Sequence, residues 1–116
     1  MTPLAHEIYR QLLRHLRRGN PSITYAELAA AVSKKYPTHP RSSALYAALG
    51  EVTSACRAKS LPCLPAIVWS STAAQPGVGY FKVAHPRAKT EKSQVEAWER
   101  EHADVVREAM KFPPTL

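Results

Sequence analysis

The sequence predicts a mainly α-helical fold that carries one small β-hairpin and ends in a further helix. Three observations indicate this class. Residues 3–18 place apolar side chains at helical spacing, and residues 24–27 contain a helix-capping signature. A third segment with helical periodicity ends near residue 59, after which the composition becomes rich in β-forming and turn residues. With 116 residues, the chain is long enough for one hydrophobic core.

The first helix is expected from residue 3 to about residue 18. Thr2 can cap it, and Pro3 suits the first turn because the proline nitrogen has no hydrogen to leave unpaired. Large aliphatic side chains recur every fourth residue and form one apolar stripe: Leu4, Ile8, Leu12 and Leu16. The Gly-Asn-Pro segment at 19–21 ends the helix.

A second helix should begin near Tyr25. Thr24 is followed three residues later by Glu27, and this spacing forms a capping box. The two prolines in segment 37–40 bound a short connection to the next helix.

A third helix is expected to begin at Ser42 or Ser43 and to run to Lys59. Its buried face is formed by Leu45, Leu49, Val52 and Cys56. The small residues Ser43, Ala47 and Gly50 lie mostly off that face. They would leave a smooth helix surface that a partner can approach closely.

Two strands are expected after the third helix. Residues 64–69 (Leu-Pro-Ala-Ile-Val-Trp) and 79–83 (Gly-Tyr-Phe-Lys-Val) have strand composition, and a stretch of small and turn residues separates them. Three helices followed by such a hairpin give a winged helix-turn-helix, with the wing at about residues 70–79.

The chain divides into three parts by these patterns. Residues 1–84 form the winged helix-turn-helix domain, residues 85–90 form a basic linker, and residues 91–116 form a C-terminal helix and tail. The last helix either packs on the body or binds a partner.

The charge is strongly positive and unevenly distributed. The formal net charge is +7, with 12 Lys or Arg against 3 acids in residues 1–90 and 4 against 6 in residues 91–116. A basic body of this kind indicates a surface for a polyanion such as nucleic acid, and a charge excess that merely aids solubility is the alternative.

Several functional classes lack support in the sequence. No apolar stretch approaches the length of a membrane span, and the N-terminus lacks the pattern of a signal peptide, so cytoplasmic residence is expected. Cys56 and Cys63 are then expected to be free thiols. The histidines and cysteines show no metal-binding spacing, and we expect no metal and no cofactor.

Four segments of the chain share a pattern with a known family, at residues 23–29, 44–49, 64–68 and 77–80. Together they resemble the C-terminal DNA-binding domain of alkylguanine-DNA alkyltransferases and of the non-enzymatic alkyltransferase-like proteins. The segment 23–29 (Ile-Thr-Tyr-Ala-Glu-Leu-Ala) is similar to the family's Thr-Tyr-Gly-Glu-Leu-Ala entry to the helix-turn-helix. Residues 44–49 resemble its small-residue recognition helix, and residues 64–68 take the place of its active-site strand. Residues 77–80 resemble its glycine-rich segment before a tyrosine. The resemblance spans residues 4–83.

The resemblance implies DNA binding without catalysis. In the family the nucleophilic cysteine directly follows the proline of the active-site strand, whereas here Ala66 follows Pro65. Cys63 lies three residues too early and has no adjacent His or Arg to lower its pKa, so we expect no catalytic residue and no enzyme activity. The family also inserts an arginine from the recognition helix to flip a base, and the matching position here is Ser43.

The candidate nucleic-acid-binding residues combine phosphate donors with small side chains on the third helix. Serine, tyrosine and lysine can bind phosphates, arginine can read guanine, and small residues permit close approach. These residues are Lys34, Lys35, Arg41, Ser42, Ser43, Tyr46, Ala47, Arg57 and Lys82. The aromatic candidates for base stacking are Tyr25, Tyr46, Trp69 and Tyr80.

The leading hypothesis is a non-catalytic protein that binds double-stranded DNA, as a regulator or as an accessory factor in DNA repair or restriction. The alternative is a protein–protein interaction module that inhibits or recruits a nucleic-acid enzyme, with Trp98 of the C-terminal helix as an exposed anchor. A third hypothesis is an enzyme that uses the thiol of Cys63.

Overall fold

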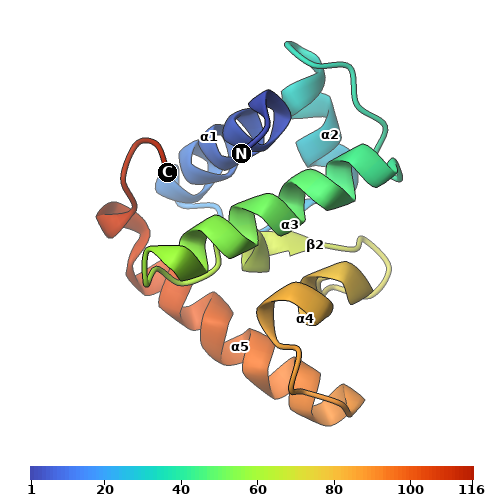
Figure 1. Cartoon of the computed structure of the whole chain (residues 1–116), viewed down its shortest axis with the longest axis vertical. Coiled ribbons are helices and arrows are strands. Elements are labelled where there is room, and N and C mark those ends of the chain that lie inside the picture. Colours follow the sequence, from blue (N-terminus) through green and yellow to red (C-terminus); the bar gives the residue numbers. More distant parts are fainter.

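The computed structural model describes all 116 residues and confirms a mainly helical fold with one small sheet (Figure 1). The elements in chain order are α1 (Pro3–Arg17), β1 (Ile23–Thr24), α2 (Tyr25–Ser33), α3 (Ser43–Ala58), η1 (Leu64–Ile67, a 3-10 turn), β2 (Val68–Trp69), α4 (Val78–Ala84), α5 (Glu91–Arg107) and η2 (Ala109–Lys111, a 3-10 turn). No helix combines the length and the apolar composition that a membrane span requires.

The core lies between α1, α2 and α3 on one side and η1, α4 and α5 on the other. Figure 1 shows α3 running across the middle of the molecule, with α1 and α2 behind one edge and α4 at the opposite edge. The apolar stripe of α1 is buried as its periodicity predicts. One continuous cluster of 26 buried apolar residues includes side chains from every α-helix.

The first three helices begin where their capping residues predict. The Thr2 hydroxyl accepts a hydrogen bond from the Ala5 N–H, which satisfies one free donor at the start of α1. At α2, the Glu27 N–H donates to Thr24 Oγ1 at 3.1 Å, and the Thr24 N–H donates to Glu27 Oε1 at 2.9 Å. The capping box is therefore complete. Ser42 caps α3 by accepting from the Leu45 N–H.

The small sheet is parallel, and this corrects the expected hairpin. Ile23 pairs with Val68 and Thr24 pairs with Trp69, so the strand before α2 lies beside the strand after η1. Residues 64–67 form a 3-10 turn in place of most of the first expected strand. β1 has only two residues, the second of which is the N-cap of α2, so it shows no alternation that local sequence could reveal.

The second expected strand is a helix. Residues 79–83 lie in α4, where Tyr80, Phe81 and Ala84 are buried while Lys82 and Val83 are exposed. Burial at positions i, i+1 and i+4 is helical spacing. A run of five residues fits either period, and its aromatic and β-branched composition favoured the wrong one. The loop before α4 is therefore no hairpin wing.

The C-terminal helix packs on the body. The Trp98 indole N–H donates to the Ala66 carbonyl at 2.9 Å, and Val105 is fully buried. The C-terminal tail also contacts the body, because the Tyr9 hydroxyl of α1 donates to the Pro113 carbonyl. Trp98 is only 8% exposed, so the prediction that it forms an exposed partner anchor is wrong. Its ring is instead stacked edge-on against Trp69 inside the fold.

Candidate nucleic-acid interface

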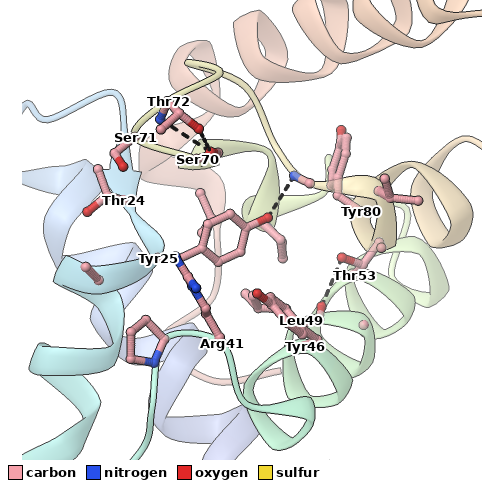
Figure 2. Close-up of a pocket in the computed structure, with 18 residues that line it drawn as sticks. Thr24, Tyr25, Arg41, Tyr46, Leu49, Thr53, Ser70, Ser71, Thr72 and Tyr80 are labelled. Atoms are coloured by element: carbon pink, nitrogen blue, oxygen red, sulfur yellow. Dashed lines mark hydrogen bonds between the residues drawn. The ribbon is translucent and has the colours of Figure 1, made fainter.

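A cavity of about 680 Å³ lies beside α3, partly open to solvent (Figure 2). Its walls come from the first turn of α2, the loop before α3 and one side of α3. The other walls are η1, β2, the loop after β2 and the first turn of α4. The parallel pairing of β1 with β2 brings these walls together, because it places Tyr25 next to the loop that follows Trp69. The volume lies within the range of about 300–1,000 Å³ typical of small-molecule sites.

Tyr25 occupies the centre of the cavity wall. Figure 2 shows its ring between the 70–72 loop and the Tyr46 and Leu49 side chains of α3. The Tyr25 oxygen accepts the Gly77 N–H at 2.8 Å, which leaves the hydroxyl hydrogen free to donate to a ligand. A Cβ atom at Gly77 would lie 3.2 Å from that oxygen, so glycine permits the contact. Burial raises the pKa of Tyr25, and the phenol stays neutral at physiological pH.

The remaining lining is mostly apolar surface with a few hydroxyls, and it is nearly uncharged. Ser70, Ser71 and Thr72 present hydroxyls from the loop, and Ser70 Oγ lies 3.0 Å from Thr72 Oγ1. Arg41 is the single charged residue of the lining, and no carboxylate belongs to it. The cavity therefore suits a ligand with hydrogen-bond acceptors and a flat apolar face, and it has one place for an anion.

The outward face of α3 adjoins this cavity. Ser43, Tyr46, Ala47 and Gly50 recur at positions i, i+3, i+4 and i+7, and none of them is buried. Tyr46 and Gly50 also line the cavity. The predicted small-residue surface is thus present, and it leads directly to the cavity mouth.

The other predicted basic residues lie at different distances from the cavity. Lys34 and Lys35 are exposed beyond the C-terminal end of α2, whereas the cavity lies at its N-terminal end. The nine residues of α2 separate the two ends by about 13 Å. Lys82 is exposed on α4, the helix whose first turn lines the cavity. Arg41 and Lys82 are therefore the predicted cations on the elements that form the site.

Arg57, one of the predicted DNA-binding residues, is engaged in contacts within the protein. Its guanidinium forms an ion pair with Glu101 of α5 and also donates to the Ala84 carbonyl at 3.1 Å. Arg57 thus holds α4 and α5 against α3. No local pattern indicates this pairing, because the two charges lie 44 residues apart in the chain.

Glu101 organises a second polar cluster behind the cavity. The Cys63 N–H donates to Glu101 Oε2 at 3.2 Å, and His85 Nε2 lies 3.7 Å from Glu101 Oε1. The same His85 nitrogen is 3.0 Å from the hydroxyl of Tyr80, which lines the cavity. Burial lowers the pKa of His85, which favours its neutral form. Glu101 therefore connects α5 to the residues behind the cavity wall.

The two thiols are inaccessible to solvent. Cys56 and Cys63 are fully buried, and neither lines the cavity. Burial raises the pKa of Cys63 to about 12, and the nearby Glu101 carboxylate acts in the same direction. We expect iodoacetamide at pH 8 to modify neither cysteine in the folded protein and both in urea. Modification of native Cys63 near neutral pH, seen by intact-mass spectrometry, would contradict this and support the reactive-thiol hypothesis.

The same burial predicts a loss of stability at high pH. The pKa values of Tyr9 and Cys63 are raised to about 12 by burial, and that of Cys56 is also raised. In the unfolded chain these groups ionise near pH 9–10, so between pH 9 and 12 the native state binds more protons and unfolding becomes easier. Each group then lowers the free energy of unfolding by roughly 1.4 kcal/mol per pH unit.

Urea unfolding at pH 8, 10 and 11 measures this effect. The Cys63→Ala variant is the control, because it lacks one of the titrating groups and should lose stability less steeply. Equal stability of the wild-type protein at pH 8 and pH 11 would contradict the prediction.

No group of three or more His, Cys, Asp or Glu side chains is placed to hold a metal ion. Comparison of the chain with protein-family models, with curated proteins and with solved structures finds no match to any of them.

Proposed function

We propose that this protein is a non-catalytic, alkyltransferase-like factor that binds double-stranded DNA in the cytoplasm and takes one base of the duplex into the cavity beside α3. The observation that carries the proposal is the continuity between the exposed small-residue face of α3 and the cavity mouth, where Tyr46 and Gly50 belong to both. A helix that enters a groove along this face would bring the cavity next to the bases. A regulator or an accessory factor in DNA repair or restriction would use such a site to examine DNA.

The chemistry of the cavity supports a nucleobase as its ligand. A base is flat and carries acceptors on its edge, and the Tyr25 hydroxyl and the loop hydroxyls can donate to such acceptors. Proteins that hold an extruded base commonly combine stacking rings with hydrogen bonds to the base edge. Arg41 at the same cavity can bind the phosphate of the extruded nucleotide.

Binding without reaction is supported by the position of the thiols, neither of which lines the cavity. Ala66 follows Pro65, and the nearest cysteine in the sequence, Cys63, points into the protein interior, where its thiol lies 3.8 Å from the Thr53 carbonyl. The free state of both buried thiols accords with the reducing cytoplasm.

A salt-series titration tests the proposal. We expect a labelled duplex to bind at 50 mM salt and the affinity to fall with a log–log slope of about −2 to −3, as two or three phosphate contacts require. Fluorescence anisotropy measures the binding, and a single strand and an RNA duplex of matched length compare the nucleic-acid classes. Failure of every duplex and single strand to bind at low salt would contradict DNA binding and leave a protein partner as the alternative.

A further inference from the structure

Tyr46 is the one large side chain among the four residues of the outward face of α3 that adjoins the cavity. The residues at i−3, i+1 and i+4 are Ser43, Ala47 and Gly50, so the Tyr46 ring projects beyond its neighbours. The side chain is 47% exposed although it touches the cavity. Its ring meets that of Tyr25 edge-on, with centroids 5.8 Å apart. This contact holds the Tyr46 ring at the cavity mouth.

Close approach of α3 to DNA leaves little space for this ring beside the bases. The small residues around Tyr46 let the helix backbone come near the groove floor, and the projecting ring must then enter the groove or pass between base pairs. A base that leaves the stack opens a gap whose two faces are flat and apolar. An aromatic ring fills such a gap, as apolar side chains do in proteins that unstack DNA.

We propose that the Tyr46 ring enters the base stack and occupies the place of the base that the cavity takes up. This inference rests on the proposed function. It assigns the stack-filling role to an aromatic side chain one turn into α3, and it assigns Arg41 to phosphate binding. The phenol oxygen is not needed for this role, since stacking uses the ring alone.

The test uses duplexes that carry the fluorescent base 2-aminopurine, which brightens when it leaves the stack. Tyr46→Ala removes the ring, Tyr46→Phe retains it, and Arg41→Ala removes the neighbouring cation. At saturating protein we expect the wild type and Tyr46→Phe to raise the fluorescence equally. We expect Tyr46→Ala to lose at least about four-fifths of that rise and to bind roughly fivefold or more weakly, because the stacking contact is gone. The slope of its log affinity against log salt should stay at the wild-type value, because no cationic phosphate contact is removed. An unchanged thermal unfolding midpoint shows that each variant is folded.

Four outcomes overturn the inference in distinguishable ways. A full fluorescence rise with Tyr46→Ala overturns the role of Tyr46 and leaves base uptake intact. A rise that is lost in Arg41→Ala and kept in Tyr46→Ala transfers the role to Arg41. Wild-type binding without any rise, at every position of the 2-aminopurine, overturns base uptake and the role of Tyr46 while DNA binding stands. Absence of wild-type binding overturns the proposed function itself.

Discussion

The double variant Arg41→Glu/Lys82→Glu is expected to bind duplex DNA about 100-fold more weakly than the wild-type protein at 50 mM salt. Both side chains are exposed on the elements that form the cavity. Each reversal removes one phosphate contact and adds a repulsion, and we expect roughly tenfold for each, or about 1.4 kcal/mol. The loss of two contacts should also reduce the slope of log affinity against log salt by about 2. Anisotropy titrations at four salt concentrations measure both quantities.

The matched control is Lys34→Glu/Lys35→Glu. Both double variants change the formal net charge by four, from +7 to +3, so they weaken the general attraction to DNA equally. The second pair lies at the far end of α2 from the cavity, and we expect it to weaken binding less than tenfold. Equal losses in the two variants would show that net charge alone drives binding, which would contradict an interface at α3 and the cavity.

The Glu101→Ala variant is expected to lower the free energy of unfolding by about 2–3 kcal/mol. Glu101 is 7% exposed and serves three partners, so its removal affects the contacts of α5 with α3, with the start of η1 and with the end of α4. The buried Cys63 N–H loses its acceptor, which costs about 1–3 kcal/mol. The loss of the ion pair adds less than in a fully buried pair, because the Arg57 side chain is 44% exposed and can turn to water. A thermal scan should show the midpoint falling by roughly 10 °C.

Two further variants assign this loss to the polar cluster. Glu101→Gln keeps an oxygen for the Cys63 N–H and removes the charge, so it should lose about half as much stability as Glu101→Ala. Asp104→Ala removes a carboxylate from the same helix, but the Asp104–Arg107 pair is exposed and contributes about 0–1 kcal/mol. Equal stability of Glu101→Ala and Asp104→Ala would show that the cluster contributes little to the fold.

The cluster also matters for the cavity. Tyr80 lines the cavity and its hydroxyl lies 3.0 Å from His85, which in turn lies near Glu101. The position of this wall therefore depends on α5, a helix that contributes no residue to the lining. The chain beyond residue 90 thus acts as a support for the site.

The helical framework could be read from local sequence. Thr2 and Thr24 satisfy free N–H groups within three residues of themselves, and a cap of this kind acts wherever the rest of the chain lies. The apolar stripe of α1 and the buried side of α3 follow from the helical period alone. The same reasoning placed Arg41 just before the third helix, and Ser43, Tyr46 and Ala47 on the exposed face of its first turns.

Only the tertiary structure decided the sheet, the cavity and the roles of the long-range polar residues. The pairing of Ile23 with Val68 depends on packing between segments 45 residues apart, and no local signal encodes it. Residues 79–83 fit a strand and a helix equally well, and burial of Tyr80 and Phe81 against the body selected the helix. Arg57 and Trp98 are residue types that are common in binding sites. In the structure, however, Arg57 pairs with Glu101, and the Trp98 indole donates to a buried carbonyl. Periodicity and capping act over a few residues, whereas the choice of partners for a charge or an indole is made by the whole fold.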